Sequence, residues 1–384
     1  MLPFARIVQY GNVAAPPVKI KKVVGGTNSA FILYDDGRLF GAGSNSNGEL
    51  NIGNYTGWNG ATPRWILSQS NVDNVWSGPF AYGVVTQIGT EFYYTGNAQA
   101  RNLNSGTYYY SPSNLNLSTA IGTTDYTVLD VRVTLYSIHF LIRMSDGSTR
   151  IYGCGRGNKL GRNDSTGSTG SISLVQSTSV IGTNIVKIDS NMNAFYYLTA
   201  SGDLYGTGVN VSNQLSTSAV STIYLTYQLQ SNNVVKTFSV GTDNYIAQSG
   251  IALYCRGNNS LNAISEITSA TTIPTYSITS SGGSTLSSSS CQLVSSNYSS
   301  AFINYNQVAY AIGNIGGIFS STVGRVSSYT NVLSSVTDFS NFSTSYNNAF
   351  WGNDDSWYMT TSTSGNGIVG VLQPNGTYKL PVNL

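Results

Sequence analysis

Short apolar segments alternate with polar turns along the whole chain. Near the start, an alternating apolar segment at residues 18–24 is followed by a continuous apolar segment at residues 30–33. An Asp36-Gly37 turn comes next, and a third segment begins with Leu39 and Phe40. Segments of this length, bounded by glycine and polar residues, predict β-strands rather than helices.

The same order of segments recurs along the sequence. Each unit has an anchor in which an aromatic residue follows an apolar residue and, in six of the seven, precedes a glycine by three positions. The aromatics lie 53, 59, 53, 49, 56 and 48 residues apart, and such a period predicts a propeller or solenoid. We expect these aromatics to be structural residues that pack between neighbouring units. The seven anchors are Phe40, Tyr93, Tyr152, Tyr205, Tyr254, Tyr310 and Tyr358.

Each unit holds enough segments for four strands. Turns such as Asp146-Gly147 and Ser201-Gly202 place glycine where a two-residue hairpin needs a positive φ. A polar loop that ends in leucine follows most anchors, as at residues 45–50 and 210–215. Weaker segments around Pro63, Pro112 or Pro274 predict a fourth strand at an edge, where proline is tolerated.

The predicted fold class is therefore all-β. We expect a seven-bladed β-propeller of four-stranded antiparallel blades over residues 18–384, because radially arranged blades bury one another's faces. Residues 1–17 precede the first unit and are predicted to be a docking arm.

Residues 26–50 resemble one repeat of the regulator of chromosome condensation family. The third and fourth units match that repeat well, the second and fifth partly, and the last two loosely. The resemblance implies a propeller whose ring is closed by strands from both chain ends, here residues 18–24 and 377–382. The family includes a nucleotide-exchange factor that docks a small GTPase and chromatin. This chain lacks a basic tail and a strongly charged face, so the resemblance implies the propeller and not exchange activity.

Composition narrows the possible functions. Only 9% of the residues are charged, against about a quarter in average domains, whereas the chain has 27 tyrosines and 41 glycines. Such a chain is expected to live in an assembly or to bind through tyrosines and amides. The net charge is +2 and the longest basic run is residues 19–22, so nucleic-acid binding is not predicted.

Catalysis has few candidate residues. The one histidine, His139, lies in an apolar segment and is predicted to be a core or interface residue. Asp35, Asp36, Asp354 and Asp355 fall in hairpins, although a chance pair of carboxylates across the propeller, as a glycosidase needs, stays open. We expect no enzyme and no cofactor.

Cysteine and segment patterns add further expectations. Cys154, Cys255 and Cys291 form no Cys-x-x-Cys pair, which predicts free buried thiols and no metal site. No signal peptide is recognisable, and no stretch approaches the roughly 18 apolar residues of a membrane helix. The protein is expected to fold in a reducing cytosol without membrane insertion.

Three functional hypotheses follow. The first is a structural virion protein of a tailed bacteriophage, a tail-associated sheath or adhesin assembled in the host cytoplasm, because low charge, abundant tyrosine and repeated β-units resemble such proteins. Its partners would be other virion proteins, copies of itself and a bacterial cell-surface receptor. The second is a cytosolic scaffold or regulator that binds a protein partner, and the third is a carbohydrate-binding or carbohydrate-processing tail protein. The arm is predicted to bind a partner through Phe4, Ile7, Val8 and Tyr10, with packing back on its own propeller as the alternative.

Overall fold

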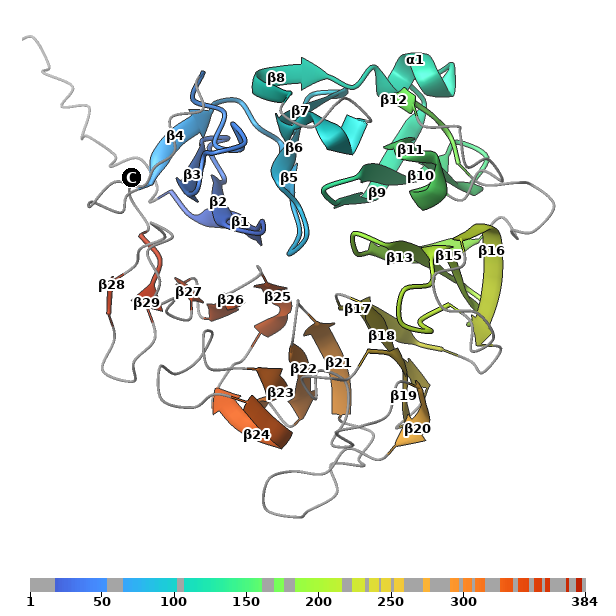
Figure 1. Ribbon diagram of the computed structural model, residues 1–384. Coiled ribbons are helices and arrows are strands. Elements are labelled where there is room, and N and C mark those ends of the chain that lie inside the picture. Colours follow the sequence, from blue (N-terminus) through green and yellow to red (C-terminus); the bar gives the residue numbers. More distant parts are fainter. Residues whose placement is uncertain are drawn as a thin grey trace, which may run out of the picture.

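A computed structural model shows antiparallel β-sheets set radially around a central axis (Figure 1). In each sheet the first strand lies nearest the axis (Figure 1). The predicted all-β propeller class is therefore confirmed. The structure describes residues 18–53, 65–101, 107–160, 169–175, 184–215, 223–231, 235–241, 243–249, 252–258, 272–276, 291–296, 300–305, 308–314, 325–333, 338–344, 349–353, 356–359, 371–372 and 378–381.

The described residues form seven sheets, and six of them have four strands in sequence order. The first three sheets lie on one side of the ring in Figure 1. The first consists of β1 (Ile20–Gly25), β2 (Ser29–Tyr34), β3 (Leu39–Gly43) and β4 (Ile66–Gln69). The second consists of β5 (Asn74–Trp76), β6 (Gly83–Ile88), β7 (Glu91–Asn97) and β8 (Tyr108–Asn114). The third consists of β9 (Tyr126–Val133), β10 (Ser137–Met144), β11 (Thr149–Gly155) and β12 (Thr169–Leu174).

The next three sheets repeat this order. The fourth consists of β13 (Ile185–Ser190), β14 (Ala194–Thr199), β15 (Leu204–Val209) and β16 (Ile223–Ser231). The fifth consists of β17 (Thr237–Val240), β18 (Asn244–Ser249), β19 (Ala252–Gly257) and β20 (Thr272–Tyr276). The sixth consists of β21 (Cys291–Ser296), β22 (Ser300–Tyr305), β23 (Val308–Asn314) and β24 (Arg325–Leu333). Among the described residues, three short helices lie in the loops: η1 (Ala98–Arg101), α1 (Leu117–Ile121) and η2 (Gly157–Lys159).

The last sheet departs from the predicted four strands. It has five, in the order β25-β26-β27-β29-β28, so the chain end inserts next to β27. Its strands are β25 (Asp338–Thr344), β26 (Ala349–Asn353), β27 (Ser356–Met359), β28 (Val371–Leu372) and β29 (Tyr378–Lys379). Elsewhere the predicted edge strands form, and β8 and β20 contain Pro112 and Pro274. Pro63 lies outside the described residues, shortly before β4.

Ring closure differs from the expectation carried by the family resemblance. Both chain ends form strands, but β1 belongs to the first sheet and β29 to the last, and no sheet of described residues contains strands from both ends. Side chains join the two sheets instead. Val23, Tyr34 and Phe40 share a buried cluster with Trp357 and Leu380. The Tyr34 hydroxyl also donates a hydrogen bond to the Pro381 carbonyl oxygen at 2.7 Å.

The hydrophobic core lies between neighbouring sheets. In β2, Ile32 and Tyr34 pack with Trp357 of the last sheet, whereas Phe31 packs with Val75 of the second sheet. Both faces of β2 are therefore covered, which explains why its sequence is a continuous apolar run rather than an alternation. Equivalent clusters join the second sheet to the third, the third to the fourth and the fourth to the fifth.

The predicted glycine turns are present, but each loop is one residue longer than predicted. The Tyr34 amide donates to the Arg38 carbonyl at 2.9 Å, which leaves three residues in the loop. Gly37 ends this loop at a φ of +83°, the left-handed position of a three-residue hairpin. Gly147 and Gly202 occupy the same position in the third and fourth sheets, with φ of +80° and +93°.

Candidate functional site

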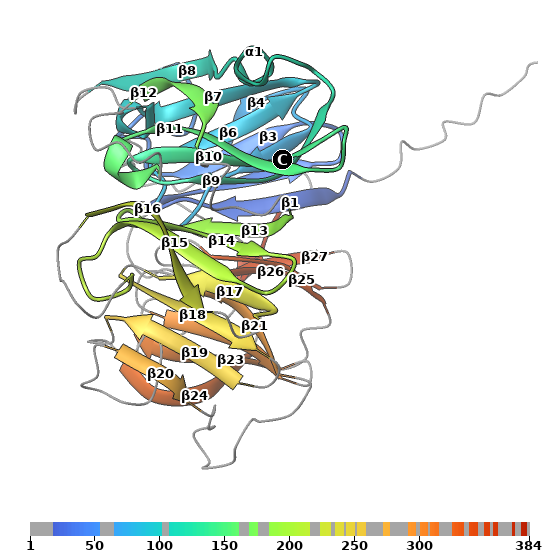
Figure 2. The ribbon, with the colours of Figure 1, turned by 90° about the vertical axis from the view of Figure 1, so that its right-hand side faces the viewer.

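The propeller has two unlike faces. We call the side that carries the three-residue hairpins at residues 35–37, 145–147 and 200–202 the hairpin face. The opposite side, which we call the turn face, carries the turns between the first two strands of each sheet and the loops that follow the anchors. Figure 2 views the ring from the side, so that the two faces lie at opposite ends of the strands.

One backbone contact recurs on the turn face. The residue after the anchor glycine donates its amide to the carbonyl of the first turn, as from Arg156 to Tyr136 at 3.0 Å. The anchor glycine makes this approach possible, because Gly155 has a φ of +129° and an added Cβ would collide with the same Tyr136 oxygen. Four other sheets make the same bond: Ser44 to Asn28, Asn97 to Tyr82, Val209 to Asn193 and Asn258 to Asp243.

Further hydrogen bonds tie the turns of the first and fourth sheets to the next blade. Thr27 donates its amide to the Ala81 carbonyl at 2.9 Å. Asn191 donates through Nδ2 to the Gly241 carbonyl at 2.8 Å, and Asn193 donates to Asp243 Oδ1 at 2.9 Å. The described part of the turn face is therefore a fixed platform rather than a set of independent loops.

Several tyrosine and arginine side chains of this platform are partly exposed to solvent. Tyr82 and Tyr136 occupy equivalent turn positions in the second and third sheets, and both are half-buried. The Arg156 guanidinium lies over the Tyr136 ring, with its carbon 3.9 Å from the ring centroid. The Lys159 ammonium is buried nearby and donates to Asn193 Oδ1 at 3.0 Å.

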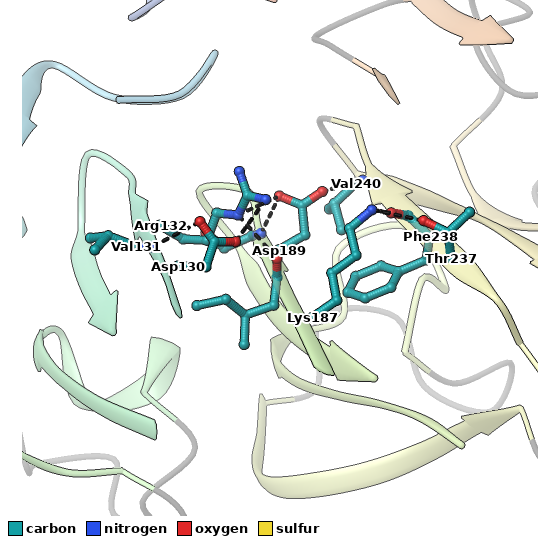
Figure 3. Close-up of polar contacts among 10 residues, drawn as sticks. Asp130, Val131, Arg132, Lys187, Asp189, Thr237, Phe238 and Val240 are labelled. Carbon is teal, nitrogen blue, oxygen red and sulfur yellow. Dashed lines mark hydrogen bonds and ion pairs between the residues drawn. The ribbon is translucent and has the colours of Figure 1, made fainter. Parts of the chain in front are cut away.

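A second group of charges lines the inner strands near the axis (Figure 3). Arg132 of β9 contacts Asp130 Oδ2 at 3.0 Å and Asp189 Oδ1 of β13 at 3.6 Å. Its Nε donates to the Ile188 carbonyl at 3.0 Å. Lys187 donates to the Phe238 carbonyl of β17 at 2.6 Å, also shown in Figure 3.

These inner charges join the first blade to the second, the third to the fourth and the fourth to the fifth. Lys22 of β1 donates to Asn74 Oδ1 of β5 at 3.0 Å, across 52 sequence positions. The bonds from Arg132 and Lys187 span 56 and 51 positions, so each matches one repeat. Asp189 accepts the Val240 amide of β17 at 3.0 Å. The network therefore acts as a structural tie between inner strands.

Burial and neighbouring charges both shift the pKa values of the charged groups in this network. Burial lowers the pKa of Lys22 and of Lys187 to about 8, and nearby aspartates oppose this shift. Burial also raises the pKa of Asp130, although Arg132 opposes it. For Arg132, burial favours a lower pKa, but Asp130 and Asp189 raise it overall. Asp130 and Asp189 are the carboxylates brought together here, and both are committed to Arg132 and backbone amides.

The other sequence candidates have structural surroundings. His139 is fully buried and stacks on Phe195 of the fourth sheet, with ring centroids 3.9 Å apart, which confirms the interface prediction. Asp36 pairs with Arg38 at 2.7 Å within its hairpin. Cys154 is buried and not in a disulfide, and its thiol donates to the Ala100 carbonyl oxygen at 3.8 Å, whereas Cys255 and Cys291 lie in β19 and β21. The remaining candidates lie outside the described residues: Asp354, Asp355 and the arm residues Phe4, Ile7, Val8 and Tyr10.

The anchor aromatics occupy corresponding positions in the third strand of each sheet. Phe40 and Tyr152 are buried and pack toward the preceding sheet, whereas Tyr93, Tyr310 and Tyr358 are half-buried. Their paired residues on the second strand are Ile32 for Phe40, Thr86 for Tyr93, Phe140 for Tyr152, Tyr197 for Tyr205, Ala247 for Tyr254, Ile303 for Tyr310 and Trp351 for Tyr358.

Sequence reasoning missed the inner charges and the Arg156 cluster. The sequence did contain a signal for the inner charges, because one position on the first strand of successive units is always polar or charged. The residues at that position are Lys22, Asn74, Asp130, Lys187 and Thr237. Within the described residues, no cluster of His, Cys, Asp and Glu could hold a metal ion. Nor does a described helix have the length and apolar character needed to cross a membrane.

The fold and these faces define a repeat-built β-propeller with a rigid turn face. Residues 20–49 match the regulator of chromosome condensation (RCC1) repeat. No curated protein sequence matches the chain significantly.

Solved structures show the same fold at low sequence identity. Human WBSCR16 is similar with a TM-score of 0.66 and 14% identity, over 90% of this chain and 94% of that one. Prp20p from Saccharomyces cerevisiae has a TM-score of 0.66 and 14% identity, over 95% and 85%. The yeast RCC1 (Prp20) structure with Kap60 bound gives a TM-score of 0.64 and 13% identity, over 89% and 78%. At these identities the likeness shows the fold alone.

Proposed function

We propose that this protein is a propeller scaffold that binds a protein partner through its turn face. The observation that carries the proposal is the fixed arrangement of that face, in which backbone and side-chain hydrogen bonds pin half-buried tyrosine and arginine side chains. A surface that is already ordered loses little conformational freedom on binding. Tyrosine and arginine are also the residues that dominate the energy of many interfaces.

The similar structures support a binding role in general terms. Yeast RCC1 (Prp20) was solved with Kap60 bound, and Prp20p was described with its binding properties to Gsp1p and histones. Those partners belong to those proteins. What extends to this chain, as part of the proposal, is the use of an RCC1-like propeller as a protein-binding platform.

A site-specific photo-cross-linking residue tests the proposal. It is introduced at Tyr136 on the turn face and, as a matched control, at Asp146 on the hairpin face of the same sheet. We expect a discrete cross-linked protein, identified by mass spectrometry, from the Tyr136 position only. Equal products from both positions, or none from Tyr136, would contradict binding through the turn face.

The proposal includes the absence of catalysis. Asp130 and Asp189, the carboxylates that meet near the axis, are engaged by Arg132 and by backbone amides. His139 is enclosed between two sheets and has no exposed surface. These placements support a binding protein over a general acid or base, and a carbohydrate-processing activity gains no support from them.

A tailed-phage virion protein is a second candidate, favoured by composition. A chain with 9% charged residues and 27 tyrosines fits a densely packed assembly in which surfaces are covered by neighbours. This proposal places the protein in the virion, with residues 1–17 docking on another chain. A truncation that starts at Val18 should then fold normally but fail to incorporate into particles. Incorporation at the wild-type level would refute the role of the arm.

A further inference from the structure

The charges of the two faces are paired differently. On the hairpin face, Arg38 lies 2.7 Å from Asp36, and the backbone amide of Lys19 donates to Asp35 at 3.1 Å. On the turn face, Arg156 has no ion pair with a described carboxylate. Its guanidinium lies flat on Tyr136, which orients the planar fork of donors. An arginine held in this way has its hydrogen-bonding edge available to a ligand.

Another cation, Lys159, lies close enough to Arg156 to feel its charge. The buried ammonium of Lys159 is fixed by Asn193, at 3.0 Å from Oδ1 and 3.4 Å from the carbonyl oxygen. Arg156 and Lys159 repel each other electrostatically, and the opposing carboxylate is Asp243. Asp243 already accepts a hydrogen bond from Asn193 at 2.9 Å. An anion that reaches Arg156 would therefore relieve a like-charge contact built into the folded protein.

Aromatic surface lies beside this cationic position. Tyr82 and Tyr136 are half-buried at equivalent turns of adjacent sheets, and Tyr136 adds to the rise that burial causes in the pKa of Tyr82. The Arg156 amide bond to the Tyr136 carbonyl, 3.0 Å long, fixes the arginine relative to the ring. Arg156 stacked on Tyr136, with Tyr82 at the equivalent turn of the adjacent sheet, combines the residue types that dominate interface hot spots.

We propose that Tyr82, Tyr136 and Arg156 form a docking site for an acidic peptide segment of a partner protein. A carboxylate of the segment pairs with the Arg156 guanidinium, and a neighbouring apolar side chain packs on the tyrosine rings. Nucleic acid fits less well, because a phosphate backbone needs a broad basic surface and the chain has only 18 Lys and Arg in 384 residues. This inference rests on the proposed function and names the chemistry of its partner.

Fluorescence anisotropy with the full chain tests the site. The probes are a short labelled peptide of alternating Glu and Leu or Tyr residues, its counterpart with Lys in place of Glu, and single-stranded DNA. Arg156→Gln is compared with Arg150→Gln, a matched control because Arg150 lies near the hairpin-face end of β11 and Arg156 directly follows its other end. Thermal melting confirms that both variants fold.

We expect the Glu peptide to bind more tightly than the Lys peptide, with a loss of roughly tenfold in Arg156→Gln, as for a broken charge-assisted contact. Arg150→Gln should bind as the wild type does. Equal losses in both variants, no loss in Arg156→Gln, or tighter Arg156-dependent binding of DNA would overturn the inference. If cross-linking at Tyr136 persists in Arg156→Gln, the acidic segment is wrong while the protein-binding function stands.

Discussion

Two loops with one design occupy the first and fourth sheets and differ at a decisive position. In residues 45–50 the Leu50 amide donates to Asn45 Oδ1 at 2.9 Å, and in residues 210–215 the Leu215 amide donates to Asn210 Oδ1 at 2.8 Å. The fifth residue of the loop is Glu49 in one and Gln214 in the other. Both side chains are buried, with 2% and 0% exposure.

The two side chains accept equivalent backbone hydrogen bonds, but only the Glu49 carboxyl can ionise. Glu49 Oε2 accepts the Asn47 amide, and Gln214 Oε1 accepts the Ser212 amide, each at 2.7 Å. Gln214 also donates through Nε2 to the Val209 carbonyl at 2.8 Å. Burial raises the pKa of Glu49 to about 7, against the hydrogen bonds that favour its charged form. The comparison shows that a repeat can keep its geometry while one copy acquires a titratable group.

The largest effect is expected from Gln214→Glu. The new carboxyl would face the Val209 carbonyl, and valine lacks the hydroxyl by which Ser44 stabilises Glu49. We expect a loss of about 3 kcal/mol or more of unfolding free energy at pH 8, as for a buried carboxylate whose pKa is raised by over two units. Denaturant unfolding at pH 8 and at pH 5 measures it. A loss that does not shrink at pH 5 would contradict the protonation argument.

The reverse substitution, Glu49→Gln, should stabilise the protein. The folded-state pKa of Glu49, about 7, is above the unfolded value of 4.5, so the folded state keeps its proton longer. Stability from this group is therefore present below pH 4.5 and falls as pH rises to 7. We expect Glu49→Gln to remove that fall and to gain on the order of 2 kcal/mol at pH 8. An unchanged pH profile of the unfolding free energy would show that Glu49 is charged at little cost.

A matched pair, Asn45→Ala and Asn210→Ala, tests whether the loops share their support. Each change removes the acceptor of a buried leucine amide, with Asn45 and Asn210 both fully buried. We expect each to cost about 1–3 kcal/mol, independent of pH between 5 and 8. Chemical denaturation provides the measurement. A twofold or greater difference between the variants would show that the sheets hold their loops by different contacts.

The smallest effect concerns the left-handed residue of each loop. Gly48 has a φ of +75° and Asn213 a φ of +60°. A Cβ on Gly48 would lie 2.6 Å from Tyr110 Cδ1, so Gly48→Asn should cost about 1 kcal/mol or more because the ring must move. Asn213→Gly should change stability by only a few tenths of a kcal/mol, to about 1 at most. Equal changes in melting temperature for the two variants would show that backbone φ alone determines which residue is tolerated at this position.

Local sequence patterns predicted much of the fold. The spacing of Tyr152, Tyr205 and the other anchors predicted the repeat, and the Asp-Gly turns predicted where hairpins would form. The hairpin length was wrong because one-residue differences depend on strand twist and bulges, which the residues 35–37 do not reveal alone. Closure by shared strands was wrong because Tyr34, Trp357 and Leu380 close the ring by packing.

The candidate site was far less accessible to sequence reasoning. Arg156 and Tyr136 lie in a polar loop and a turn, and nothing local shows that the guanidinium stacks on the ring. Arg132 meets Asp189 only because two inner strands lie side by side in a given register. Residues one repeat apart are equivalent in sequence, but their contact depends on how far one blade is rotated against the next.

Local sequence signals are sufficient to define the repeated unit, because strand order, anchor glycines and leucine-terminated loops all follow from short-range sterics and alternation. Which unit faces which depends on the folded ring, and so does whether a polar side chain is paired, buried or available. The loop sequence shows that Glu49 can ionise where Gln214 cannot, but only its burial in the folded protein raises the pKa of Glu49 to about 7. The physical reason is that backbone conformation is set within a few residues, whereas desolvation and charge pairing depend on neighbours a full repeat away.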